Sequence, residues 1–346
     1  VKRAEAEARA EQNVRALEGN RKNRKAGLFY HYLTAMDAGP VPQDVVSTID
    51  STLLFAGVLV AGSYFGGEVR EVGDRLFSAA DWSFFVEQNP STHEPHMKGF
   101  ISLGWKPEDF ADPTGAGALH PYYWADSGDE HRLVCFLAAS APIESHRADP
   151  QLYWKLRRPL GEYKDTGPMV YLPWSGAMFA NFFAHCFVNY SGMGVDDPKL
   201  HGVDRRPQVD WWENSRRAVG LHRHKAREAA ARFPTLGENA WGLTACDIPK
   251  GYGVPGVYPD PIAFPELVAD VDFPKWTPKD DNREKQARGM FGHLCLYNRL
   301  NVSMSRQKKL LVVAGDSGLL QSDLAAEFIP GLVDFHNLCR TEGRIL

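Results

Sequence analysis

The chain has 346 residues, of which 44% are hydrophobic and 24% charged, so it carries enough apolar side chains for a buried core. This composition excludes disordered, collagen-like and coiled-coil proteins. The formal net charge is −4, which gives no overall positive field that would attract nucleic acid or an anionic membrane.

The cysteines and the absence of a long apolar run indicate in which cellular compartment the protein is expected. Five cysteines lie far apart without a C-x-x-C pair, which predicts neither a disulfide framework nor a zinc site and is typical of a reducing compartment. No run of eighteen apolar residues occurs, and the chain begins with a charged stretch instead of a signal sequence. We therefore expect no membrane partner and favour a cytoplasmic location; a truncated N-terminus would leave a periplasmic one open. The oligomeric state stays unknown at this level.

The sequence has three consecutive regions that differ in composition and in the spacing of their apolar residues. Residues 1–26, rich in Ala, Glu, Arg and Lys, predict a charged and solvated helix. Residues 27–262 combine helical spacing of apolar residues with loops rich in Gly, Pro and Asp, and we expect helices over 49–64, 69–86, 130–139, 177–190 and 211–233. In residues 263–346, the run KLLVVA (309–314) predicts a buried parallel strand and 323–339 a helix. The predicted fold class is mainly α, followed by a small α/β C-terminal segment.

The sequence contains no complete motif for a common cofactor or metal. Gly251, Gly253 and Gly256 have the G-x-G-x-x-G spacing, but no strand is predicted before them and two prolines interrupt the stretch. The dipeptide Gly-Lys is absent from the sequence, so the chain has no P-loop for ATP. His93 and His96 have no third ligand at a recognisable spacing. We expect no cofactor and no metal site.

Several carboxylic acids stand beside aromatic residues. Cleavage of a glycosidic bond needs one protonated carboxyl and one carboxylate, and flat aromatic rings suit pyranose faces. The acids of this kind are Asp50, Asp126, Asp129, Glu130, Asp204, Asp210 and Glu213. The neighbouring rings that could face a sugar include Trp105, Trp124, Trp211 and Trp241. Asp50 and Glu130 also begin helical patterns, where a carboxylate stabilises free N–H groups, so a purely structural role stays open.

The order of several segments between residues 27 and 260 resembles the bacterial glucoamylase-like family, which includes endo-acting enzymes on β-1,2-glucans. The segments are GLFYHYL (27–33), VVSTIDSTLLFAGVLVAGSYF (45–65), DWSFF (81–85), LGWKPE (103–108), DEHRLVCFLAASAP (129–142), GAMFANFFAHCFVNY (176–190), DWWENSRRA (210–218) and ENAWGLTACDIPKGYGVPGVYPD (238–260).

This resemblance implies an α/α toroid of helical hairpins and inverting hydrolysis of a glucan by paired carboxylates. Carried over by position, the catalytic acid is Glu130, with Asp129 and Asp50 close to the cleft. The expected sugar contacts are Trp105, Trp124, Trp211, Trp241, Tyr252 and Asp210.

The chain departs from the family pattern in two ways. Val45 stands where the family has an acid before its STID-like segment. Further hairpins before residue 27 and after residue 260 have no counterpart, so the toroid is expected to be incomplete. An inactive hydrolase and a non-catalytic carbohydrate-binding protein therefore stay open as alternatives.

The tail resembles a different family. RGMFGHLCLYNRLNVSMSRQKKLLVVAGDSGLL (288–320) is similar to the last motor segment of superfamily 1 helicases, in which the arginine matching Arg306 contacts the ATP γ-phosphate. Without a P-loop, Arg306 would be vestigial, and nucleic acid would be a partner only with a separate ATPase. We interpret the chain as a fusion, with a helicase fragment as the alternative function.

Overall fold

The computed structural model describes residues 2–88, 99–248, 251–263, 320–321, 325–326 and 329–342. The chain divides into two compact units: residues 1–242 with 257–274, and residues 243–256 with 275–346. Residues 243–256 therefore group with the C-terminal unit, whereas the sequence suggested one boundary near residue 262. The assignment of residues 1–26, 27–262 and 263–346 to a charged helix, a glucoamylase-like domain and a helicase-like segment stays a prediction. The described structure of the first unit is mainly helical, as expected.

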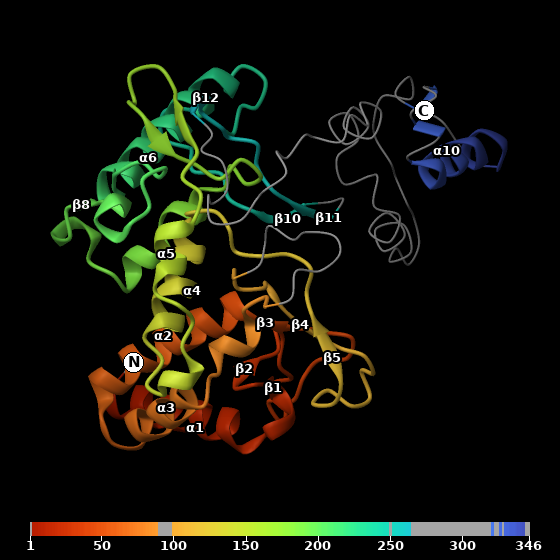
Figure 1. The fold of residues 1–346 in the computed structure, drawn as a ribbon. Coiled ribbons are helices and arrows are strands. Elements are labelled where there is room, and N and C mark those ends of the chain that lie inside the picture. Colours follow the sequence, from red (N-terminus) through yellow and green to blue (C-terminus); the bar gives the residue numbers. More distant parts are fainter. Residues whose placement is uncertain are drawn as a thin grey trace. The chain divides into compact units, whose positions relative to one another are not determined.

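Three helices form the beginning of the first unit, coloured red to orange in Figure 1: α1 (Arg3–Gly19), α2 (Thr48–Phe65) and α3 (Gly67–Ser78). Helix α1 buries only Val14 and lies against α3, with an ion pair between Glu18 and Arg75. Gly66, at φ 75°, ends α2 in a conformation that side-chain-bearing residues rarely adopt, and α3 begins at once. The apolar faces of α2 and α3 pack on each other.

Helix α2 confirms the helix expected over 49–64. Its length and mean hydropathy of 1.4 would suffice to cross a membrane, but a core helix meets the same criteria. It packs against both α3 and α4, and Phe55 is fully buried. These contacts are those of a core helix.

The second half of the first unit contains α4 (Asp129–Ala139), α5 (Gln151–Lys155) and α6 (Trp211–Ala229). Helix α4 contacts α2 and α5. These bounds confirm the helix expected over 130–139 and most of the one expected over 211–233. Helix α4 buries most of its surface, including Leu133 and Val134, because its apolar residues cover nearly every side.

Short antiparallel strands hold the loops between the helices. They are β1 (Arg24–Lys25) with β2 (Leu28–Phe29); β3 (Val46–Ser47), β4 (Gly104–Pro107) and β5 (Gly117–Leu119); β7 (Met169–Val170), β6 (Leu160–Glu162) and β12 (Asp260–Ala263); and β8 (Val195–Asp196) with β9 (Val209–Asp210). Strand β3 pairs Ser47 with Gly104. A Cβ at Gly104 would lie 1.9 Å from the Val46 carbonyl oxygen, so this pairing requires glycine. Each of these strands has at most four residues, which is why the sequence showed no alternating pattern.

The helix expected over 177–190 is wrong. The structure has three separate 3₁₀ turns there: η5 (Met178–Asn181), η6 (Ala184–Cys186) and η7 (Tyr190–Gly192). Two backbone groups bond to side chains from elsewhere: the Ala184 N–H donates to Asp129 at 2.8 Å, and the Asn181 carbonyl accepts from Ser215 at 2.8 Å. These tertiary bonds compete with the helical ladder.

The helix expected over 69–86 is shorter than predicted. Helix α3 ends at Ser78, and a 3₁₀ turn, η2 (Trp82–Phe85), follows. The Asp81 N–H donates to the Ala26 carbonyl, and the Asp81 carboxylate caps η2 by accepting from the Phe84 N–H at 3.3 Å. Other 3₁₀ turns in the described residues are η1 (Arg21–Asn23), η4 (Glu144–His146) and η8 (Pro198–His201).

In the second unit, the described residues form the hairpin β10 (Cys246–Ile248) and β11 (Gly251–Gly253) and the helix α10 (Pro330–Glu342). Helix α10 covers part of the helix expected over 323–339. Arg306, the strand expected over 309–314 and the residues His93 and His96 lie outside the described residues.

Candidate active site

Asp50 lies in the first turn of α2, which begins at a well-fixed point. The Ser47 hydroxyl accepts a hydrogen bond from the Asp50 N–H at 3.2 Å and donates one to its carboxylate. The Thr48 hydroxyl donates to the Ser102 carbonyl at 2.8 Å, which ties this helix end to the loop before β4. The Asp50 side chain is 40% exposed, and His31 Nε2 lies 3.6 Å from its Oδ2 atom. Asp50 is thus held in place and open to solvent.

Glu130 lies in the first turn of α4 and is largely buried. Burial, then the nearby charge of Asp50, then that of Asp129 raise the pKa of Glu130 from its ordinary 4.5 to about 7. Within the part of the chain that the structure describes, no hydrogen bond or ion pair satisfies its carboxyl. The first turns of α2 and α4 therefore bring together one carboxyl that keeps its proton near neutral pH and one solvent-accessible carboxylic acid.

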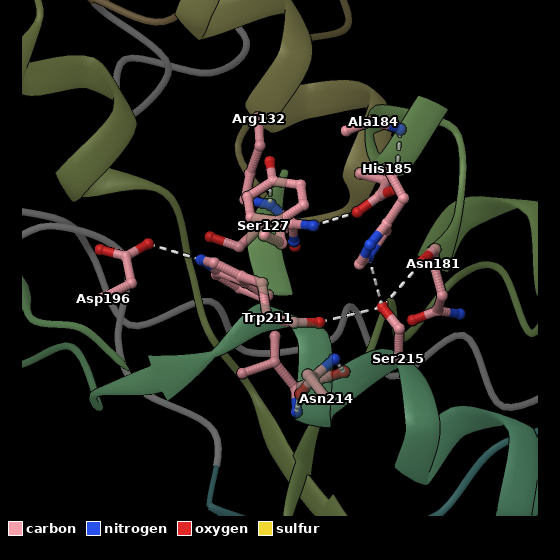
Figure 2. A network of polar contacts seen from close by, with 12 residues as sticks. Ser127, Arg132, Asn181, Ala184, His185, Asp196, Trp211, Asn214 and Ser215 are labelled. Atoms are coloured by element: carbon pink, nitrogen blue, oxygen red, sulfur yellow. Dashed lines mark hydrogen bonds and ion pairs between the residues drawn. The ribbon is translucent and has the colours of Figure 1, made fainter. Parts of the chain in front are cut away.

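Asp129 precedes Glu130 but has a different environment. Its side chain is fully buried, with one oxygen paired to Arg132 and the other accepting from the Ala184 N–H. Arg132 also donates to the Ser127 carbonyl at 2.8 Å and lies over the Trp211 ring at 3.6 Å (Figure 2). Asp129 thus joins the start of α4 to η6 and has no oxygen left for a substrate.

The same network reaches the start of α6. The Ser215 hydroxyl lies between His185 Nε2, at 2.8 Å, and the carbonyls of Asn181 and Trp211, to which it donates (Figure 2). The Trp211 indole N–H donates to Asp196, and the Asn214 side-chain amide bonds to the backbone of Val170. These contacts fix the loop segments around the buried ends of α4 and α6.

Three tryptophans expected to contact sugar lie in the core. Trp105 is 1% exposed, Trp124 6% and Trp211 2%. Trp105 lies under the Lys25 ammonium, and Trp124 donates to the Thr48 hydroxyl at 2.8 Å. Buried rings offer no face to a pyranose, so this part of the expectation is corrected: in the structure the three rings pack in the core.

The other expected contacts lie elsewhere. Asp210 caps α6 by accepting from the Glu213 N–H at 3.0 Å, which is the structural role that acids at helix starts often have. Trp241 is 40% exposed and lies in the first unit, next to the last residue of its stretch 1–242. Tyr252 is 43% exposed and belongs to β11 of the second unit. Contact of Trp241 and Tyr252 with sugar stays a prediction.

Sequence reasoning missed an aromatic cluster beside α4. The ring of buried His131 lies between Trp124, at a centroid distance of 4.5 Å, and Trp174, at 5.8 Å. Burial lowers the pKa of His131 to about 4, so it is neutral at neutral pH. The signal that could have pointed to Trp174 is a tryptophan in the loop LPWSG, flanked by turn residues.

Comparisons with known proteins show which families the chain is similar to. Residues 121–268 match the family described as "Putative glucoamylase". An exo β-1,2-glucooligosaccharide sophorohydrolase (non-reducing end) of Parabacteroides distasonis is 22% identical over 224 residues, which are 59% of this chain and 28% of that protein.

Solved structures share the fold. An endo-β-1,2-glucanase from Chitinophaga pinensis, in complex with sophorotriose and glucose, aligns with a TM-score of 0.56 and 18% identity over 75% of this chain and 60% of that chain. A "putative glucoamylase" from Bacteroides uniformis aligns with a TM-score of 0.57 and 19% identity over 73% of this chain and 59% of that chain. The chain thus has a glucoamylase-like fold and spans less than two thirds of the length of these proteins.

Proposed function

We propose that this chain carries the active site of a glycoside hydrolase that cleaves a β-glucan with inversion, Glu130 being the general acid. The observation that carries the proposal is the pair of acids in the first turns of the contacting helices α2 and α4, with Glu130 largely buried and Asp50 40% exposed. Burial and the charge of Asp50 raise the pKa of Glu130 to about 7. A general acid must hold its proton near the working pH, and burial provides this here.

The proposed reaction uses the two first-turn acids on one bond. Glu130 donates its proton to the glycosidic oxygen, and the bond between that oxygen and C1 breaks. Asp50, as carboxylate, accepts a proton from a water molecule whose oxygen bonds to C1 from the opposite face. Glu130 ends ionised and Asp50 protonated, and proton exchange with solvent restores both. The open environment of Asp50 suits a residue that must reach water.

Asp129 has a positioning role in this proposal. Both of its oxygens are engaged, so it cannot take a proton from water, although its charge contributes to the raised pKa of Glu130. It fixes the first turn of α4 against η6 and Arg132. Trp105, Trp124 and Trp211 support the site from the core.

The substrate class follows from the related proteins. Both the curated relative and the Chitinophaga pinensis enzyme are named for β-1,2-linked glucans. We infer that a β-1,2-glucan is the first substrate to test. We further propose that the first unit forms part of an α/α toroid, because α2 and α4 present their first turns at the same end.

The test compares hydrolysis and binding of β-1,2-gluco-oligosaccharides by the wild type and Glu130→Gln. We expect hydrolysis by the wild type, its loss in Glu130→Gln by at least about a hundredfold, and retained binding, because the amide keeps the shape but cannot donate the catalytic proton. The matched control is Glu144→Gln, which changes an exposed glutamate of η4. Binding without hydrolysis by the wild type would instead identify a non-catalytic carbohydrate-binding protein, and full activity of Glu130→Gln would exclude Glu130 as the acid.

A further inference from the structure

Trp174 combines exposure with firm anchoring. Trp174 is 51% exposed, so much of its indole ring is open to solvent. The indole N–H donates to Asp126 Oδ2 at 2.9 Å. A freely exposed tryptophan would lack such a fixed partner.

The anchor of Trp174 is itself buried and held. Asp126 is 3% exposed, and its carboxylate forms an ion pair with Arg157, with 2.6 Å between Oδ1 and Nε. The Arg157 Nη2 atom donates to the same Asp126 oxygen that accepts from Trp174, at 2.8 Å. A buried carboxylate fixed on both oxygens is a rigid acceptor for the indole N–H.

A stack of rings supports Trp174 from the protein side. The planes of His131 and Trp174 differ by only 12°, and their offset centroids are 5.8 Å apart. His131 contacts Trp124 in turn, and Trp124 is fixed to Thr48 in the first turn of α2. One side of the indole is therefore covered, and its exposed area is available to another flat, weakly polar surface.

The position of Trp174 relates it to the proposed acid. His131 directly follows Glu130 in α4, so the ring stack lies beside the first turn that carries Glu130. Asp126 lies in the loop that leads into the same turn. Trp174 is thus anchored through residues on both sides of Glu130 in the sequence.

We propose that Trp174 is a binding platform for one glucosyl unit of the substrate, beside the bond that Glu130 protonates. This inference rests on the proposed function. The ring hydroxyls of a β-glucosyl unit are equatorial, which leaves C–H groups on both faces of the ring, and these suit the electron-rich face of an indole. The platform is pre-organised, because its position is fixed by Asp126 and His131 before the sugar arrives, and the entropic cost of binding is correspondingly small.

The experiment measures binding and turnover separately. Binding of a β-1,2-linked glucotetraose is measured by isothermal titration calorimetry in the Glu130→Gln background, where the ligand is not cleaved, with and without Trp174→Ala. We expect Trp174→Ala to weaken binding by at least about tenfold, as removal of a central aromatic anchor commonly does. In the otherwise unchanged enzyme it should raise KM by a similar factor and change kcat by less than about threefold.

Two further variants test whether the effect on binding depends on an aromatic ring and on its position at residue 174. Trp174→Phe keeps an aromatic ring without the N–H and should recover part of the affinity. Tyr64→Ala truncates an aromatic side chain of similar exposure, 61%, at the opposite end of α2 from Asp50, and should bind as the parent does. Unchanged binding by Trp174→Ala, where the parent binds the tetraose, would overturn the platform alone. No binding by the parent would overturn the proposed function and the platform with it.

Discussion

Glu130 and Asp129 are neighbours in the sequence and differ in almost everything that decides the role of a carboxyl group. Asp129 is fully buried with Arg132, so its charge is compensated. Glu130 is largely buried without such a partner among the described residues, so its charged form is disfavoured. A general acid needs the second environment. Both acids can be identified as candidates from the sequence. Their roles differ because Arg132 pairs with only one of them, and the fold decides which one.

The raised pKa of Glu130 predicts a pH-dependent effect on stability. Because the pKa in the folded protein, about 7, lies above the ordinary 4.5, the stability associated with protonated Glu130 is present below about pH 4.5 and lost as the pH rises to about 7. The full pKa difference corresponds to about 3 kcal/mol. Glu130→Gln should therefore increase the free energy of unfolding by about 3 kcal/mol more at pH 8 than at pH 4.5.

Urea denaturation at the two pH values measures this difference. Glu144→Gln, at an exposed position, should show no such pH dependence. An effect of Glu130→Gln that is equal at both pH values would show that Glu130 is not held in its protonated form by the fold.

The aromatic residues show that the solvent exposure of a single side chain could not be predicted from the sequence. Trp105, Trp124 and Trp211 stand beside acids in the sequence, yet all three are buried, whereas Trp174, which has no acid next to it in the sequence, is half exposed and bonded to Asp126. Proximity along the chain does not determine which ring faces solvent. That property depends on long-range packing, which local sequence does not contain.

At the scale of elements, the sequence predicts those helices whose stability depends on their own apolar pattern. Helices α2, α4 and α6 begin and end close to the expected residues. Residues 177–190 carry an equally apolar pattern but form 3₁₀ turns, because Asp129 and Ser215 engage their backbone. Side chains 30 or more residues away decide this outcome, so no local rule could predict it.

Two glycines test the packing of α2 against α3. A Cβ at Gly57 in α2 would meet no atom within 4 Å, whereas a Cβ at Gly73 in α3 would lie 2.6 Å from Val58 Cγ1 in α2. Gly57→Ala should stabilise the protein by about 0.5–1 kcal/mol through helix propensity. Gly73→Ala should destabilise it by about 1–2 kcal/mol, because overpacking outweighs the same gain in propensity.

Thermal and urea unfolding of the two variants measure this contrast. Val58→Ala removes the atom that the new methyl group would meet, so the loss caused by Gly73→Ala should shrink in the Val58→Ala background. Stabilisation by Gly73→Ala alone, equal to that by Gly57→Ala, would contradict the close packing of the two helices.

At the scale of the whole molecule, the resemblance to a known family predicted the fold better than composition or the spacing of apolar residues did. The resemblance to glucoamylase-like proteins led to a fold that solved structures share, with TM-scores of 0.56 and 0.57. Composition excluded several classes of protein but indicated no architecture. The division of the chain was harder to predict, because residues 243–256 group with a unit that lies mostly later in the sequence. The interpretation of the tail as helicase-like stays a prediction.

The most direct test of the central claim is the anomeric configuration of the first product. A β-1,2-gluco-oligosaccharide is incubated with the wild-type protein, and the anomeric protons of the new reducing end are followed by NMR before mutarotation equilibrates them. If Glu130 and Asp50 act as an inverting acid and base, the α-anomer appears first, and Asp50→Asn loses this signal together with Glu130→Gln. A first product in the β-configuration, or no cleavage by the wild type, would contradict the account.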